Sequence, residues 1–248
     1  MPEPTRTLLV LADSLAYFGP NGGLPADDPR IWPNLVAAEL GWTLELVAQI
    51  GWTSREAYWA LIKDPRAWAA LPKAGALVIA VCGMDTLPSP LPTAVRETIR
   101  YIRPPQLRRR VREAYQWAQP RLAPLGWPIA LPARLTVEYQ EEIRSSVAAL
   151  RPDLPVVATL PSVHCAPSYA KVHRGRRKTA AALSTWAGRN RLPVVDLKAA
   201  VEEHVLAGRG NPDGIHWGFE GHERVAAAML RELRQVAEPS ADPTGGRQ

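Results

Sequence analysis

The stretch TLLVLADSL, residues 7–15, begins with a run of almost entirely apolar residues and then turns polar at Asp13 and Ser14. A near-continuous apolar run of this length is typical of a β-strand that is buried on both faces, as in a parallel sheet. Ser14 would then lie just beyond the carboxyl end of the strand. It is either a nucleophile or only the first polar residue of a turn.

Other short apolar runs resemble this one and are predicted as further strands. They are Leu44 to Ile50, Ala76 to Val81, Val156 to Leu160 and Val194 to Leu197, which with residues 7–12 makes five. Helix-like segments separate them, and strands that alternate with helices are typical of α/β proteins. The sequence therefore predicts an α/β fold: a three-layer α/β/α sandwich around a parallel sheet of about five strands.

The ends of several helices can be predicted from their capping residues. Asp28-Pro29 is expected to begin a helix that ends at Leu40, before Gly41. Thr53 and Glu56 have the spacing of a capping box for a second helix. The remaining clear helical candidates are residues 174–189 and 218–236, and the latter has apolar residues spaced for one buried face.

One region breaks this alternation. Residues 86–153 form a proline-rich and arginine-rich segment that is far longer than an ordinary crossover, so we interpret it as an inserted, mostly helical cap. Residues 239–248 are polar and contain Gly and Pro, and are expected to be disordered. We thus expect a single domain over residues 1–238 with a cap insertion and a C-terminal tail.

Composition limits the possible classes of protein. The chain has 248 residues, a net charge of +6 and only two cysteines, Cys82 and Cys165, without the repeated Cys/His spacing of a structural zinc site. The positive charge favours an anionic partner, which could be a nucleic acid, a membrane surface, a nucleotide-bearing cofactor or an acidic metabolite. No apolar run is long enough for a signal-peptide core or a membrane span, so we expect a cytoplasmic protein without stable membrane insertion.

Candidate functional groups follow the predicted strands. Ser14 follows the first strand, Gly51 the second, and the trio Gly83-Met84-Asp85 the third. Open α/β sheets bind ligands beyond the carboxyl ends of their strands, so these groups are aimed at one edge. Near the C-terminus, Asp213 and His216 are three residues apart, so a single turn could place the carboxylate against the imidazole, as a base paired with a serine requires.

These blocks resemble the four sequence blocks of the SGNH, or GDSL-type, hydrolase and acyltransferase superfamily. ADSL, the glycine after the second strand, GMD after the third, and DGIHWGFEGH occur in the order and spacing of that superfamily. The resemblance implies a flavodoxin-like fold. It also implies that Ser14 is the nucleophile, His216 the base and Asp213 its partner, and that the backbone amides of Ser14 and Gly51 donate to the oxyanion.

Two positions depart from the superfamily pattern. Ala12 stands where the first block has Gly, which extended backbone tolerates. Asp85 stands where the third block usually has Asn, whose side-chain amide is a third oxyanion donor. Because an ionised carboxylate would repel an oxyanion, we expect Asp85 either to be protonated and donate, or to turn away and bind an acceptor hydroxyl; the second is favoured.

Within the superfamily the chain looks most like mycobacterial-type acyltransferases, which implies transfer of an octanoyl group from acyl-CoA to a hydroxyl of a glucosylglycerate-type acceptor. Acyl-CoA would be a co-substrate, with no bound cofactor or metal, and the cap would exclude water. An esterase or thioesterase with the same residues is an alternative, and a non-enzymatic domain that binds nucleic acid is a further one. We expect small-molecule substrates rather than nucleic acid; the oligomeric state is left open.

Other residues are weaker candidates. Cys82 is expected to be a core residue, and a His164-Cys165 nucleophile pair is conceivable. The basic clusters at residues 108–110 and 173–178 are either solvated helix faces or sites for phosphate or carboxylate groups. Trp117 and Trp127 could line an acyl or sugar site, or belong to the core.

Overall fold

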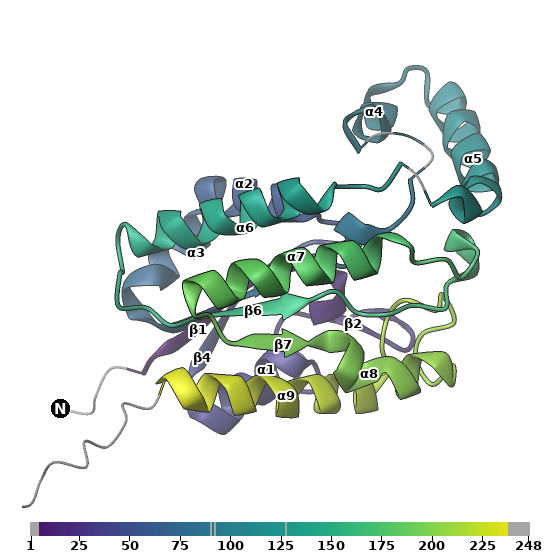
Figure 1. The fold of residues 1–248 in the computed structure, drawn as a ribbon. Helices are drawn as coiled ribbons and strands as arrows, with labels where there is room; N and C mark the ends of the chain where they lie inside the picture. Colours follow the sequence, from purple (N-terminus) through teal and green to yellow (C-terminus); the bar gives the residue numbers. More distant parts are fainter. Residues whose placement is uncertain (1–4, 90, 92, 127, 238–248) are drawn as a thin grey trace, which may run out of the picture.

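The computed structural model describes residues 5–89, 91, 93–126 and 128–237 of the chain. Its central sheet has five parallel strands in the order β4-β1-β5-β6-β7 (Figure 1). These are β1 (Thr7–Ala12), β4 (Thr43–Ala48), β5 (Ala74–Ala80), β6 (Val156–Leu160) and β7 (Val194–Asp196). A small antiparallel pair is formed by β2 (Phe18–Gly19) and β3 (Gly22–Gly23). The predicted five-stranded parallel sheet is confirmed.

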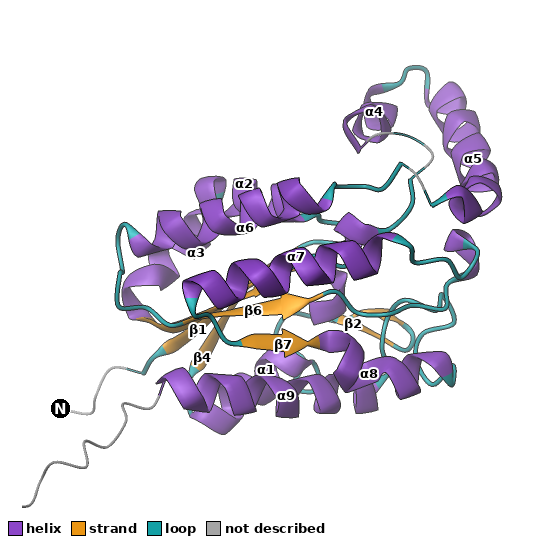
Figure 2. Cartoon of the chain, viewed as in Figure 1, coloured by secondary structure: helices purple, strands orange, loops and turns teal. Residues whose placement is uncertain are grey.

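Helices cover both faces of this sheet, as Figure 2 shows. One layer contains α1 (Trp32–Leu40), α8 (Leu197–Leu206) and α9 (Phe219–Ala237). The opposite layer contains α2 (Ser54–Lys63), α3 (Pro65–Ala70), α6 (Ala133–Ala148) and α7 (Gly175–Asn190). Outside these layers stand α4 (Thr93–Thr98) and α5 (Pro105–Leu122). Short 3₁₀ helices are η1 (Ser14–Ala16), η2 (Leu71–Lys73), η3 (Met84–Thr86), η4 (Ile99–Tyr101), η5 (Ala123–Leu125) and η6 (Pro167–Tyr169). The predicted three-layer sandwich is confirmed.

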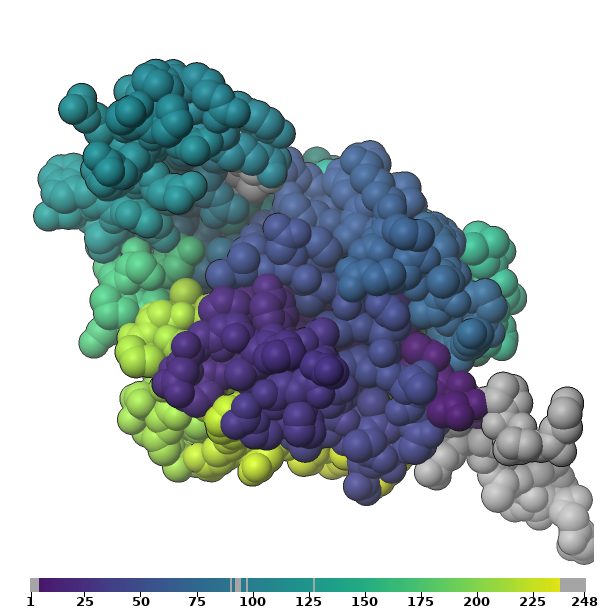
Figure 3. Space-filling view, turned by 180° about the vertical axis from the view of Figure 1, so that it is seen from behind, coloured from purple at the N-terminus to yellow at the C-terminus, as the bar shows by residue number. Residues whose placement is uncertain are grey.

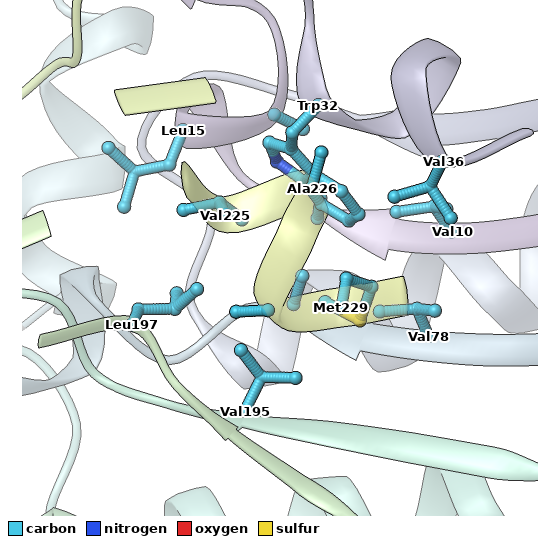
Figure 4. Packing of buried hydrophobic residues seen from close by; sticks show 14 of the residues in the cluster. Val10, Leu15, Trp32, Val36, Val78, Val195, Leu197, Val225, Ala226 and Met229 are labelled. Carbon is cyan, nitrogen blue, oxygen red and sulfur yellow. The ribbon is translucent and has the colours of Figure 1, made fainter. Parts of the chain in front are cut away.

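Strand β1 lies at the centre of the core. Its residues are all buried, and they alternate between the two helical layers because side chains in a strand point to opposite faces. Leu8 and Val10 belong to the cluster packed under α1 and α9, whereas Leu9 and Leu11 belong to the cluster under the opposite layer. Figure 4 shows the first cluster, in which Met229 of α9 lies among side chains from the sheet.

The first helix begins later than the sequence predicted. The Asp28 carboxylate accepts hydrogen bonds from the N–H and the guanidinium of Arg30, which closes a turn instead of a helix. Helix α1 therefore begins at Trp32, with a proline in its first turn. It ends at Leu40, and the following Gly41 has a φ of +66°, which suits the left-handed cap. The predicted start at Asp28-Pro29 is wrong, and the predicted end is confirmed.

The other predicted helix ends agree with the structure. The capping box forms as expected, with the Thr53 N–H donating to the Glu56 carboxylate over 2.8 Å at the start of α2. Helices α7 and α9 occupy the two segments predicted near the C-terminus. The tail predicted over residues 239–248 lies outside the described residues.

The predicted cap insertion includes a helix that belongs to the sandwich. Helix α6 packs between α2 and α7, and its residues Ile143 and Val147 are fully buried in the core. The segment that projects from the body is therefore residues 87–132, shorter than the predicted 86–153. The reason is that a crossover between parallel strands β5 and β6 still needs a helix to cover the sheet.

The two ends of this projecting segment (residues 87–132) are held together by backbone hydrogen bonds. The Ser89 N–H donates to the Pro128 carbonyl over 2.8 Å, and the Ala130 N–H donates to the Leu87 carbonyl over 2.9 Å. Pro88 and Ile129 form an antiparallel bridge between them. The projecting segment thus leaves and rejoins the body at one place. Figure 1 shows α4 and α5 outside the sandwich.

Among the described residues, no helix is both long enough and apolar enough to span a membrane.

A core substitution distinguishes the sandwich from the projecting segment. Ile143→Ala in α6 is expected to lower the free energy of unfolding by about 2–5 kcal/mol, because it leaves a cavity in the core. The matched control Leu107→Ala in α5, where the side chain is 47% exposed, should cost less than about 1 kcal/mol. Urea unfolding measures both. Equal losses would contradict the assignment of α6 to the sandwich.

Candidate active site

The site lies where the strand order reverses. The chain passes from β1 to its neighbour β4 on one side and then returns to β5 on the other, and open α/β sheets bind ligands at such a switch point. Ala12 is paired with Ala48 of β4 and with Ala80 of β5, so these three strands end at the same level. The loops that follow them therefore meet at one edge.

Ser14, His216 and Asp213 come together at this edge. The hydroxyl of Ser14 lies 2.8 Å from Nε2 of His216, and Nδ1 of His216 lies 2.5 Å from Oδ2 of Asp213. With Nδ1–H donating to the carboxylate, Nε2 is left to accept the hydroxyl proton. Ser14 and His216 are buried, at 4% and 7% exposure. The geometry is that of a serine nucleophile, a histidine base and an orienting acid.

Asp213 is fixed by the turn that precedes α9. Its Oδ1 accepts the N–H groups of Ile215 and His216, over 2.8 and 3.1 Å, which leaves Oδ2 for the imidazole. Burial raises the pKa of Asp213, but these N–H groups and the imidazole outweigh it, so the pKa lies below its ordinary value. Gly214 has a φ of +73°, and a Cβ there would lie 2.8 Å from the Ala166 nitrogen. The turn therefore requires a glycine.

Phe18 contacts the His216 ring, and His222 in turn holds Phe18; the sequence indicated neither contact. Phe18 stacks on the imidazole of His216, with ring centroids 4.3 Å apart. The Phe18 carbonyl in turn accepts from Nε2 of the fully buried His222, whose Nδ1 accepts the Trp32 N–H at the start of α1. Burial lowers the pKa of His222, in agreement with a neutral ring that donates at one nitrogen and accepts at the other. No pattern in the sequence signals these contacts, because they join three separate segments.

A small cavity adjoins Ser14. Its free volume is about 20 Å³, room for about one water molecule. Apolar side chains dominate its wall, together with two histidines: Leu15, Met84, Leu87, Val163, His164, His173 and Ile215. The two imidazole rings lie 4.5 Å apart. Burial lowers the pKa of both histidines. For His173 the charges of His164 and Arg176 lower the pKa further, to about 3. Both rings are therefore neutral near pH 7.

Asp85 does not face this cavity. It is fully buried, its Oδ1 accepts the Ser54 N–H over 2.9 Å, and its Oδ2 lies 2.7 Å from the Ser54 hydroxyl at the start of α2. Burial raises the pKa of Asp85 to about 6, against the lowering effect of the bonds from Ser54. Neither expected role, oxyanion donor or acceptor ligand, fits this placement. Within the trio, Gly83 and Met84 line the cavity instead.

Gly51 lies in the turn after β4 with a φ of +77°, a conformation that favours glycine. It lines a separate, much larger groove beside α2 and not the small cavity at Ser14. A hydrogen bond from the Ile50 backbone to the Tyr17 hydroxyl ties this turn to the segment that follows Ser14. The oxyanion role of the Ser14 and Gly51 amides remains a prediction.

Asp13 is a second buried acid, next to Ser14 in the chain. Its Oδ1 accepts the Leu15 N–H over 2.9 Å and so caps η1, the turn that carries Ser14. Burial raises the pKa of Asp13 to about 7, although the Leu15 N–H lowers it, and the negative charge of Asp85 adds to the rise.

The weaker candidates lie elsewhere. Cys82 is a core residue. The Cys165 thiol donates to the Val205 carbonyl, and Cys165 and His164 line different cavities. In the basic cluster at 173–178, Arg176 binds the Pro161 carbonyl and Asp196. Trp117 is 63% exposed under Arg121, and Trp127 lies outside the described residues.

The other basic cluster is exposed. In the run at 108–110, Arg109 pairs with Glu113 on the surface of α5. Within the described part of the chain, no group of three or more His, Cys, Asp or Glu is placed to hold a metal ion.

Comparison with characterised sequences gives close relatives. A diglucosylglycerate octanoyltransferase from Mycolicibacterium hassiacum is 60% identical over 94% of this chain and 97% of its own length. Another protein of that name, from Mycobacterium tuberculosis, is 58% identical over 96% of both chains. This chain belongs to the diglucosylglycerate octanoyltransferase family. No general family model matches it.

Solved structures show that this octanoyltransferase family member has the fold of the SGNH/GDSL superfamily. A lipase/acylhydrolase from Enterococcus faecalis superposes with a TM-score of 0.61 at 14% identity, over 93% of this chain and 96% of its own. A carbohydrate acetylesterase family member from Sinorhizobium meliloti gives a TM-score of 0.56 at 15% identity, over 94% and 99%. The fold implied by the resemblance drawn from the four sequence blocks is confirmed.

The triad can be tested by covalent labelling. A fluorophosphonate is expected to label Ser14 in the wild type, and Ser14→Ala should abolish this labelling. His216→Ala should abolish it too, because no base then accepts the hydroxyl proton. Asp213→Asn should slow it by about 10²–10⁴-fold, because the imidazole loses its orienting acceptor. Mass spectrometry of the labelled peptide and the rate of labelling are measured; wild-type labelling at any residue other than Ser14 would contradict the assignment.

Asp13 should make stability depend on pH. Between its ordinary pKa of 3.8 and about 7, the folded protein binds a proton that the unfolded chain has lost, so stability falls as pH rises through this window. At about 1.4 kcal/mol per pKa unit, the contribution is on the order of 4 kcal/mol. Asp13→Asn should reduce the difference in free energy of unfolding between pH 4.5 and pH 8 by a comparable amount.

The control for this experiment is Asp27→Asn, which changes the same charge at an exposed position. It should leave the pH dependence as in the wild type. Equal pH dependence in wild type and Asp13→Asn would show that Asp13 titrates normally.

Proposed function

We propose that this protein transfers an octanoyl group from an acyl-CoA to a hydroxyl of diglucosylglycerate through an acyl-serine intermediate. The observation that carries the proposal is the Ser14–His216–Asp213 arrangement in a chain that is 60% identical to a diglucosylglycerate octanoyltransferase over 94% of its length. An acyl-CoA donor implies a cytoplasmic reaction.

In the first half-reaction, Nε2 of His216 removes the proton from the Ser14 hydroxyl. The oxygen attacks the thioester carbonyl, a C–O bond forms, and the C–S bond breaks. The imidazolium, stabilised by Asp213, returns the proton to the departing thiolate. We propose that the backbone amides of Ser14 and Gly51 stabilise the transient oxyanion.

In the second half-reaction, the acceptor hydroxyl takes the place of the thiol. His216 removes its proton, the sugar oxygen attacks the acyl-serine carbonyl, and Ser14 leaves with the proton that His216 returns. Productive transfer requires that water is excluded. The nearly closed, apolar surroundings of Ser14 support this, and side chains such as Met84 and Leu87 would have to move to admit an acyl chain.

The SGNH fold also supports ester hydrolysis with the same three residues, since the neighbouring structures include a lipase and an acetylesterase. Water would then replace the sugar hydroxyl in the second half-reaction. The identity of the final acyl acceptor separates the two functions.

The proposal predicts an isolable acyl-enzyme. Without acceptor, incubation with octanoyl-CoA should octanoylate Ser14, as peptide mass spectrometry would show. Addition of diglucosylglycerate should remove the acyl group and yield its octanoyl ester, whereas Ser14→Ala should give neither product. If the wild type released only octanoic acid at saturating acceptor, the protein would be a thioesterase.

A further inference from the structure

A large groove beside α2 has no role in the chemistry at Ser14. Its volume is about 1160 Å³, and it begins at Gly51 in the turn after β4. One wall is α2, and the other carries Arg96 of α4 and Arg100 of η4, both in the projecting segment. Figure 3 shows the projecting segment, in teal, rising from the body beside the blue surface to which α2 contributes.

The groove carries an excess of positive charge. Its cations are Arg55, Lys63, Arg96 and Arg100, and its carboxylates are Glu56 and Asp64. Both carboxylates are already engaged: Glu56 pairs with Arg55 over 2.8 Å, and Asp64 pairs with Arg66 over 2.7 Å. Within the described residues, neither Lys63 nor Arg96 has a carboxylate at ion-pair distance, so their charges are available to an anion.

An aromatic surface lies beside these cations. The indole of Trp59 is 46% exposed on α2 and faces the groove, with the Lys63 ammonium 4.9 Å from its ring centre. An exposed tryptophan next to cations is a platform on which a nucleobase stacks while its phosphates meet the positive charges. Trp52 adds a second indole nearer to Gly51.

The groove has the position and length needed to reach the nucleophile. Strand β4 leads to Gly51 at one end of the groove, and its neighbour β1 leads to Ser14. The Gly51 end of the groove therefore lies at the same edge of the sheet as Ser14. From there α2 runs for ten residues, about 15 Å, to Lys63. A pantetheine arm, which is an extended chain with two amide groups, spans a comparable distance between a thioester and a diphosphate.

We propose that this groove binds the 3′-phosphorylated adenosine diphosphate part of the acyl-CoA donor, with its phosphates on Lys63 and Arg96 and its adenine on Trp59. The inference rests on the proposed function, because it identifies where the donor of that reaction is held. The acceptor fits the groove less well, since a glycerate offers one carboxylate to several cations, whereas the donor offers a diphosphate and a further phosphate.

The test compares two donors that carry the same thioester. Octanoyl-CoA has the nucleotide, and octanoyl-pantetheine lacks it. In Lys63→Ala and in Arg96→Ala, the ratio of kcat/KM for octanoyl-CoA to that for octanoyl-pantetheine should fall about tenfold, because each variant loses a charge-assisted contact to phosphate. Trp59→Ala should lower the same ratio through loss of stacking. The control Arg109→Ala removes the same charge from the projecting segment outside the groove and should leave the ratio unchanged.

The outcomes that oppose the proposal are distinct. An unchanged ratio in all three groove variants would overturn it, and so would a rise in KM for diglucosylglycerate alone, which would assign the groove to the acceptor.

The groove can also be tested if the wild type transfers no acyl group from either donor and the proposed function fails. Titration calorimetry with adenosine 3′,5′-bisphosphate then decides. Binding to the wild type that weakens about tenfold in Arg96→Ala supports the groove, and no binding to the wild type overturns it.

Discussion

The candidate active site depends on the parallel pairing of β1 with its two neighbours. Ala12 is level with Ala48 on one side and Ala80 on the other, so the loops that carry Ser14, Gly51 and the GMD trio leave the sheet together. Because β1 is buried on both faces, a slip of one residue would exchange its two sets of side chains between the helical layers. The hydrogen bond between Ser14 and His216, 202 residues later, needs this register.

The imidazole of His216 is held from more than one direction. Asp213 holds one nitrogen and Phe18 covers one ring face, while the fully buried His222 holds the Phe18 carbonyl. His222 can do this only when neutral, because its other nitrogen must accept the Trp32 N–H. The orientation of the His216 ring therefore depends on the protonation state of a second histidine in the core.

The sequence predicts the sheet and the contact between Asp213 and His216 because both signals are local. An apolar run marks each strand, and Asp213 and His216 are separated by a single turn. The sequence does not predict which of two neighbouring side chains faces the site. In the trio after β5, the start of η3 turns Asp85 beneath α2 and Met84 toward the cavity, which no composition rule distinguishes. Likewise, the sequence around α6 resembles a cap. In the structure α6 is the crossover helix that covers the sheet between β5 and β6. The stacking of Phe18 on His216 depends on tertiary packing alone.

The placement of Asp85 and Met84 bears on the kind of donor that the site can use. The thioether of Met84 has no N–H for an oxyanion. Burial, and to a smaller extent the charge of the buried Asp85, raises the pKa of Asp13 beside Ser14. In the proposed reaction, stabilisation of the oxyanion would then rest on backbone amides, against an unfavourable local charge. A thioester carbonyl is more electrophilic than that of an oxygen ester, and its thiolate is a better leaving group. The proposed acyl-CoA, as an activated thioester, would suit such a site, and its anionic nucleotide also matches the positively charged groove that begins at Gly51.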